Sequence, residues 1–326
     1  MPGIITIAKK EFTDHVSDQT FLICFGMLLV VMVTSTLYQL DYIHSQMAFL
    51  VPNAGFFESE LWKDPQVSAM LQTVLTDNIS FLGALVAIAL SFNSINKERT
   101  EGSLRVLLSY PISKTKVILG KLLGGFAVVI IVTVVSLVIS LSIEMYSLSI
   151  PLSDDVFLRL ATIIGLGIVL LAFFLCLGTA VSVVIRDSST CLISLLIIIT
   201  LFQANTVAMI LVAVGNLLPR SISINGGRGF FQYAPSINSW QIPQVLTLVN
   251  RVLLRVSPVI AYRTLSNNLF HFQNVYAPGI PNIIPIITIE YTWLFPRNVD
   301  LMWTPIIYLV VAFFAAIALF LWRDID

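Results

Sequence analysis

The sequence predicts an all-α membrane protein with six transmembrane helices and an N-terminal interfacial helix. Three observations predict this class. Hydrophobic residues make up 57% of the chain. Charged residues make up only 11%, against the roughly 25% of a soluble domain. The apolar residues also gather in runs about as long as the ~20 residues that a helix needs to cross a bilayer. The charges lie mostly between these runs, where a membrane would end and water begin.

The chain of 326 residues is expected to form a single transmembrane domain. Residues 1–18 place apolar and charged side chains on opposite sides of a helix, which is typical of a helix lying along a membrane surface. A loose charged tail is the alternative for this segment. No cleavable signal is expected, because the first apolar run is longer than a signal core. The six spans are expected at about residues 20–40, 78–95, 117–143, 157–185, 191–218 and 303–322.

The loops set the expected orientation. Lysine and arginine are concentrated in the short loops on one side, which the positive-inside rule places in the cytoplasm. We therefore expect a multi-pass protein of the cell membrane with both termini and the loop 96–116 in the cytoplasm. The long segment 219–302 is expected outside. Residues 245–256 within it follow helical spacing, but two arginines exclude a further span there. Glu144 ends the third span and is expected among the outer headgroups.

The residue pattern predicts no catalytic, metal or cofactor site in this chain. His15, His44 and His271 stand alone, without neighbours at metal-ligand spacing. Gly120-Lys121 lacks the upstream glycine and the hydroxyl residue of a phosphate-binding loop. The spans offer no nucleophile with a base and no carboxylate pair, so the chain is not expected to be an enzyme. Scattered basic residues exclude a nucleic-acid surface.

The loop 96–116 carries the pattern most suggestive of function. Leu104, Leu107 and Leu108 fall on one face of a short helix, because they are spaced i, i+3 and i+4. Pro111 ends that helix. An apolar ridge of this size suits docking into a groove on another protein. The alternative is that the charges only obey the positive-inside rule and the leucines rest on lipid headgroups.

The same loop resembles that of ABC-2 type permeases, the membrane subunits of a class of ATP-driven transporters. The similarity lies in the run Glu98-Arg99-Thr100-Glu101-Gly102-Ser103-Leu104, then Leu107-Leu108-Ser109-Tyr110-Pro111-Ile112-Ser113-Lys114, then Gly120-Lys121. Ser103 stands where a threonine is commoner. The outline of the chain is also similar to the family: a surface helix, six spans, a large outer segment and a terminal Arg-Asp pair.

The resemblance implies that residues 98–111 act as a coupling helix seated in a separate ABC ATP-binding subunit, which would hold ATP and Mg²⁺. It also implies a homodimer, or a heterodimer with a related permease, that exports its substrate across the lipid membrane by alternating access. The alternative is an ABC-type mechanotransmitter or scaffold that binds an ATPase but moves no substrate. The implied docking residues are Glu98, Arg99, Glu101, Gly102, Leu104, Arg105, Leu107, Leu108 and Pro111.

Polar residues within the spans are candidates for lining a substrate path. Gln203 and Thr206 lie three residues apart in the fifth span and share a helix face, and Asn93 lies near the inner end of the second span. Asn205 diverges from Gln203 by ~200° and is expected to pack against another span. Hydrogen bonding between packed spans is the alternative for all of them.

Overall fold

The fold is described from a computed structural model, which covers residues 2–50, 76–100, 102, 113–147, 154–203, 257–270, 274–275, 286–287 and 299–322. These residues are helical except for turns and one short antiparallel pairing. In that pairing β1 (Asn274–Val275) lies beside β2 (Ile286–Ile287), with Asn274 opposite Ile287. The all-α prediction is therefore confirmed for the described part of the chain.

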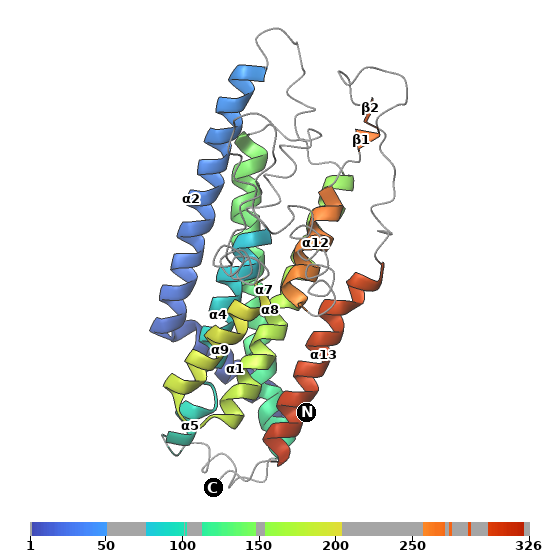
Figure 1. Ribbon diagram of the computed structural model, residues 1–326. Coiled ribbons are helices and arrows are strands. Elements are labelled where there is room, and N and C mark those ends of the chain that lie inside the picture. Colours follow the sequence, from blue (N-terminus) through green and yellow to red (C-terminus); the bar gives the residue numbers. More distant parts are fainter. Residues whose placement is uncertain are drawn as a thin grey trace, which may run out of the picture.

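Four long helices run side by side (Figure 1) and form the frame of the molecule: α2 (Gln19–Leu50), α7 (Lys114–Ser147), α8 (Asp154–Val184) and α13 (Val299–Trp322). The second predicted span is broken into a π-helical turn, η2 (Ile79–Gly83), followed by α4 (Ala84–Ser91). Five described stretches are long and apolar enough to cross a membrane: Gln19–Asp41, Thr76–Thr100, Lys114–Ser147, Leu160–Val184 and Trp303–Trp322. They match the first four predicted spans and the last.

The fifth predicted span corresponds to α9 (Ser188–Phe202), an apolar helix of 15 residues. It begins after Asp187, whose carboxylate accepts hydrogen bonds from the hydroxyl and the backbone N–H of Thr190. These hydrogen bonds lower the pKa of Asp187, and the bond from the Thr190 hydroxyl has the largest effect. They also satisfy a helix N–H that would otherwise have no partner. The remainder of the span, from residue 204 onward, lies outside the described residues.

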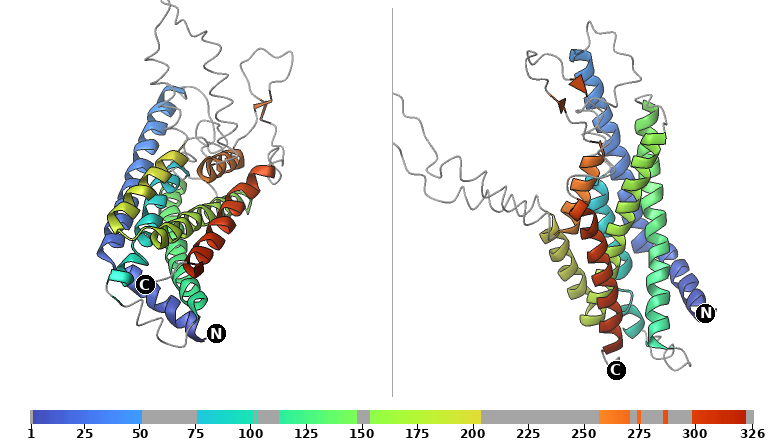
Figure 2. Two further views of the ribbon diagram at one scale, coloured as in Figure 1. Left: turned by 60° about the horizontal axis from the view of Figure 1, so that its bottom comes forward. Right: turned by 90° about the vertical axis from the view of Figure 1, so that its right-hand side faces the viewer.

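At one end of the frame lie two short helices, α1 (Pro2–Ser17) and α5 (Asn96–Thr100), together with the last turn of α13 (Figure 1). The segment predicted as an interfacial helix is thus helical as α1, and its place along a membrane surface stays a prediction. Figure 2 shows α1 leaving the lower end of the bundle at an angle to the long helices. It packs closely against α7. A Cβ at Gly120 would lie 2.6 Å from Ile7 Cγ2, and one at Gly124 only 2.8 Å from the carbonyl oxygen of Ala8.

The two glycines therefore allow α1 to approach α7 closely, as small residues four positions apart do in membrane helix pairs.

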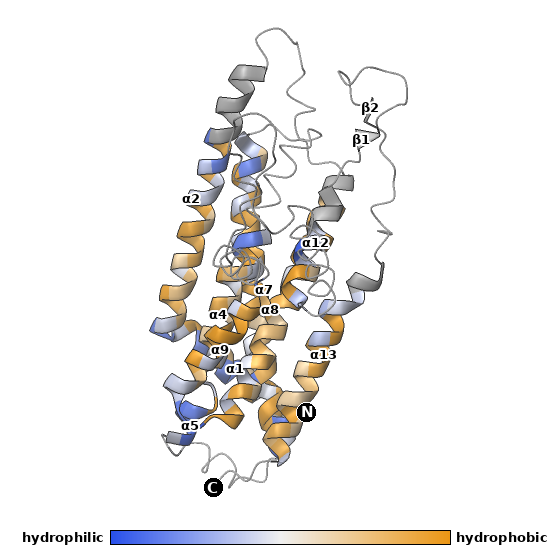
Figure 3. Ribbon diagram, viewed as in Figure 1, coloured by the Kyte–Doolittle hydropathy of each residue, from blue (hydrophilic) through white to orange (hydrophobic). Residues whose placement is uncertain are grey.

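The interior of the bundle is apolar and aromatic. Phe173 stacks edge-on against the rings of Phe174, Phe202 and Tyr308, with centroids 5.1, 5.9 and 5.8 Å away. Hydrophobic residues also cover the outer faces of α2 and α13 (Figure 3), where water would not tolerate so much apolar surface. This surface fits lipid.

One helix was not foreseen from the sequence. α12 (Pro258–Phe270) lies within the segment 219–302 and packs against α13, α8, α9 and η2. Its Tyr262 is fully buried. Arg263 Nε lies 2.9 Å from Asp77 Oδ1 and donates to Ser80 Oγ at 3.0 Å. The helix predicted at 245–256 lies outside the described residues, so its placement stays a prediction.

Candidate functional site

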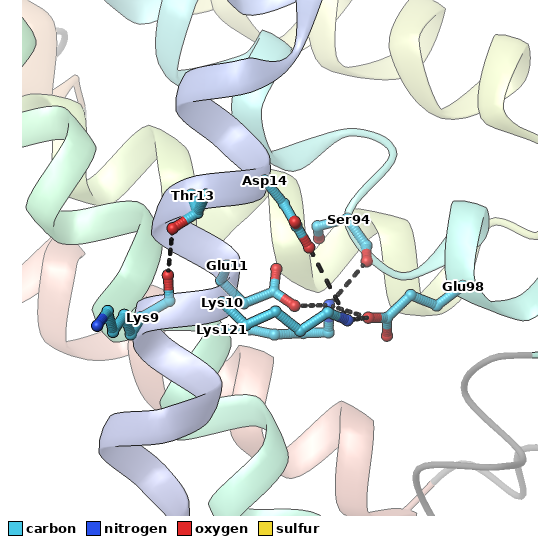
Figure 4. A network of polar contacts seen from close by, with 8 residues as sticks. All are labelled: Lys9, Lys10, Glu11, Thr13, Asp14, Ser94, Glu98 and Lys121. Carbon is cyan, nitrogen blue, oxygen red and sulfur yellow. Dashed lines mark hydrogen bonds and ion pairs between the residues drawn. The ribbon is translucent and has the colours of Figure 1, made fainter.

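A buried lysine joins three separate segments at the end of the molecule that carries α1 and α5. Lys121, near the start of α7, has a side chain only 3% exposed. Its Nζ lies 2.9 Å from Glu11 Oε1 on α1 and 3.0 Å from Glu98 Oε1 on α5. It also donates a hydrogen bond of 3.2 Å to the carbonyl oxygen of Ser94 (Figure 4). We call Glu11, Glu98 and Lys121 the inner triad.

The inner triad carries one positive and two negative charges, so a second cation improves its balance. Lys10 Nζ supplies it, 3.8 Å from Glu98 Oε1, and lies equally far from Asp14 Oδ2. The two lysines differ in environment. Lys10 is 55% exposed, and exposed ion pairs contribute roughly 0–1 kcal/mol. Removal of one partner from a buried pair costs about 3–5 kcal/mol, because an uncompensated charge remains.

These ion pairs connect the start of the loop 96–116 to both α1 and α7. α5 holds Glu98, α1 holds Glu11, and both carboxylates meet on Lys121 of α7. His15 lies partly buried one turn beyond Glu11 on α1. Burial lowers the pKa of His15 below its usual value of 6.5, while the neighbouring Glu11 raises it. A neutral imidazole is therefore favoured beside the triad.

Of the docking residues that the resemblance implied, three lie in the described part of the chain. Glu98 belongs to the inner triad. Arg99 Nη1 donates a hydrogen bond of 3.5 Å to Asn96 Oδ1. Gly102 has φ +74°, the left-handed conformation that suits glycine after the end of a helix. Glu101, Leu104, Arg105, Leu107, Leu108 and Pro111 lie outside the described residues, so their docking role stays a prediction.

The polar residues suggested for a path make contacts between segments. Asn93 Oδ1 accepts a hydrogen bond of 2.7 Å from Ser188 Oγ. Gln203 is buried at the end of α9, and its Nε2 donates to the carbonyl oxygen of Ser80 in η2 at 3.1 Å. Thr206 and Asn205 lie outside the described ranges. A role in lining a path stays a prediction for Asn93, Gln203 and Thr206.

Sequence reasoning missed two members of the inner triad, Glu11 and Lys121. A signal for Lys121 was present: it is a cation inside the predicted apolar span 117–143, which usually marks a paired residue. Its position inside Gly120-x-x-x-Gly124 also indicates a face that another helix approaches. Glu11 carried no comparable signal, since an acidic residue on an interfacial helix is expected in water.

Comparison with known proteins identifies the family. The family model described as ABC-2 family transporter protein matches residues 5–325. The chain belongs to this family. Among curated proteins, a similar one is the probable ABC transporter permease protein NosY of Pseudomonas aeruginosa. It is 26% identical over 137 residues, which is 41% of this chain and 43% of that protein. The alignment thus spans less than half of the relative's length.

Membership of the ABC-2 family confirms the resemblance that the loop 96–116 indicated. With several long apolar helices in the structure, this ABC-2 chain is a multi-pass membrane protein. The family supplies the permease component of ABC transporters, whose ATPase is usually a separate subunit. The inner triad lies at the end of the helix bundle that carries α5, where the predicted coupling loop begins.

Proposed function

We propose that this chain is the permease subunit of an ABC exporter that works by alternating access. A separate ATP-binding subunit would bind ATP and Mg²⁺ and dock against the loop 96–116. The observation that carries the proposal is the attachment of Glu98, at the start of that loop, to Lys121 of α7 at 3.0 Å. A displacement of the loop would be transmitted to a membrane-spanning helix.

The inner triad supports this role because it couples rigid elements. α7 continues for 34 residues from the loop across the bundle, and packed helices shift as bodies between discrete arrangements instead of flexing continuously. α1 would move with α7, since Glu11 shares Lys121 with Glu98. ATP binding that closes two docked ATPases would thus reorient spans on both sides of the triad.

A pair of permeases is the second part of the proposal. A path for a bulky substrate forms most simply between two subunits, either two copies or this chain with a related permease. Asn93, Gln203 and Thr206 are the polar groups we assign to that path, and lipid covers the remaining apolar faces. The termini and the ATPases would lie in the cytoplasm, and the complex in the cell membrane.

Mutation of the apolar ridge tests the docking step. Leu107→Asp should abolish capture of a co-expressed ATP-binding subunit, because an unpaired charge buried in a dry groove costs more than the roughly 2–7 kcal/mol of an unpaired neutral polar group. Leu107→Met, which keeps an apolar side chain of similar volume, is the matched control and should bind normally. Undiminished capture and transport by Leu107→Asp would contradict the docking role.

A mechanotransmitter that binds the ATPase but moves nothing is the second candidate. The observation that favours it is that both described path candidates, Asn93 and Gln203, make hydrogen bonds between segments. Reconstitution of permease and ATPase into sealed vesicles separates the two functions. ATP-dependent loss of a candidate substrate from the medium into inside-out vesicles supports the exporter. ATP hydrolysis without any flux, across a panel of substrates, supports the mechanotransmitter.

A further inference from the structure

A second buried acid lies at the other end of α7, far from the inner triad. Glu144 is only 3% exposed, and its Oε1 has no hydrogen-bond partner. No salt bridge to Glu144 is present in the part of the chain that the structure describes. The residue was expected among outer headgroups, but the structure buries it within the protein. The proposed transport mechanism does not use this carboxyl.

A second unpartnered oxygen lies on the neighbouring helix, α2. Gln39 Oε1 is buried without a hydrogen-bond partner. The two helices run in the same direction (Figure 1) and are joined by a buried hydrogen bond of 2.7 Å between Thr36 Oγ1 and Ser140 Oγ. Gln39 follows Thr36 by three residues, and Glu144 follows Ser140 by four. Both therefore lie about one turn above that bond.

Helix geometry also places them on the same side of the contact. At ~100° per residue, Gln39 is turned by about 60° one way from Thr36, and Glu144 by about 40° the other way from Ser140. On two parallel helices that face each other, these opposite rotations lead to the same side. Two unpartnered buried oxygens, Gln39 Oε1 and Glu144 Oε1, thus share one corner above a pair of hydroxyls.

The chemistry of this corner requires a positive charge. An ionised carboxylate buried without a partner is very costly, so the site must hold a proton or a cation. Carboxylate, amide and hydroxyl oxygens are ligands that suit hard cations. Arg263 of α12 is not free to supply that charge, because it already pairs with Asp77. Other charged or titratable residues toward this end of the packed helices are Tyr38, Asp41, Tyr42 and His44 on α2, Tyr146 on α7, Asp154, Asp155 and Arg159 on α8, and Asp300 on α13.

We propose that Glu144 and Gln39, with the Thr36–Ser140 pair beneath them, form a site that takes one positive charge, either a proton or Na⁺, in the outer half of the bundle. The charge would neutralise Glu144 and satisfy the Gln39 oxygen. It would thereby join α2 to α7 above the hydroxyl pair. Release of the charge would leave two unpaired oxygens between these helices and loosen their contact.

Infrared difference spectroscopy of the full-length permease in lipid tests the site. In sodium-free choline buffer at neutral pH, we expect the stretching band of a protonated carboxyl, absent from Glu144→Gln. If added Na⁺ removes that band, Na⁺ displaces the proton; if the band persists, the proton is the resident charge. Both results support the site. A wild-type spectrum identical to that of Glu144→Gln, with and without Na⁺, would overturn it.

Three further variants test the interpretation. Gln39→Leu removes the neighbouring oxygen and should shift the Glu144 band or raise the Na⁺ concentration needed to remove it, by about tenfold if Gln39 supports the site as ligand-orienting groups do. Asp41→Asn is the control, because Asp41 is exposed near the same end of α2 and should leave the band unchanged. Should Glu144→Gln fail to fold, Glu144→Asp keeps the carboxyl and should displace the band. No displacement in either Gln39→Leu or Glu144→Asp would overturn the proposal.

Discussion

At the scale of single residues, Lys121 is the group on which the inner end of the molecule depends. Lys121→Met removes the cation that Glu11 and Glu98 share and leaves the Glu11 carboxylate, whose side chain is only 7% exposed, without this lysine. We expect a loss of about 3–5 kcal/mol in stability, seen as a lower melting temperature in detergent. Lys10→Met, which removes an exposed lysine 3.8 Å from Glu98, should cost less than about 1 kcal/mol. Equal melting of the two variants would contradict the role of Lys121.

His15 gives the inner end a pH dependence whose sign follows from burial. Its pKa is lowered in the folded protein, so the unfolded chain binds the proton more readily. Stability is therefore full above the usual pKa of about 6.5 and falls as the pH falls below it. His15→Gln should flatten the dependence of the melting temperature between pH 7.5 and 5.5. Asp14→Asn should steepen it, because Asp14 raises the pKa of His15. An unchanged slope in both variants would exclude His15 as the cause.

The sequence pattern around Glu98 predicts a functional residue but not the residues that pair with it. Glu98 was predicted as part of a functional loop because its neighbours form a recognisable run. Its partners Glu11 and Lys121 were not predicted, because these two residues are separated by 110 positions in the chain. Periodicity predicts which face of a helix is apolar, but not which distant helix brings a countercharge. The burial of Glu144 was missed for the same reason: a carboxylate at the end of a span reads as a solvated group.

At the scale of elements, the contact of α1 with α7 depends on two glycines. A Cβ at Gly124 would meet the backbone oxygen of Ala8 at 2.8 Å and Glu11 Cβ at 2.7 Å. Gly124→Val should therefore push α1 away, cost about 1–3 kcal/mol and weaken ATPase coupling with it. Gly165→Ala is the control, because nothing lies within 4 Å of a Cβ there. The measurements are detergent melting and ATP hydrolysis of the assembled complex. If Gly124→Val hydrolyses ATP and melts as the wild type does, close contact between α1 and α7 is not required for coupling.

The long helices were predictable because twenty apolar residues in succession leave few alternatives to a span. The short elements were not. Residues 258–270 begin with a proline and contain an arginine and two asparagines, which reads as a loop. They form α12 because Tyr262 is buried by neighbouring helices and Arg263 pairs with Asp77. The π-helical turn η2 likewise has no local signal. Its Ser80 is held by Gln203 and Arg263, residues far along the chain.

At the scale of the whole molecule, the two ends differ in the charges they hold. The inner triad, α5 and the turn before α9 lie at one end, where the positive-inside rule places the cytoplasm. The opposite end carries the last turns of α2 and α7 and the buried acid Glu144. Because α7 (Lys114–Ser147) contains both Lys121 and Glu144, one continuous helix connects the inner triad to the proposed outer charge site. A displacement of α7 at either site would therefore also move the other site.

This arrangement predicts which positions are reached from each side of the membrane. Ser189 is exposed at the start of α9, and Tyr146 is 90% exposed at the end of α7. In a Cys24→Ser background, whose remaining Cys176 and Cys191 are buried, a cysteine at 146 should react with a membrane-impermeant thiol reagent in intact cells. A cysteine at 189 should react only after the inner face is opened. If the labelling pattern is reversed, the orientation of the protein is opposite to the predicted one. The inner triad would then lie outside, away from any cytoplasmic ATPase. Labelling of both positions from one side would mean that α8 does not cross the membrane, because that helix separates them.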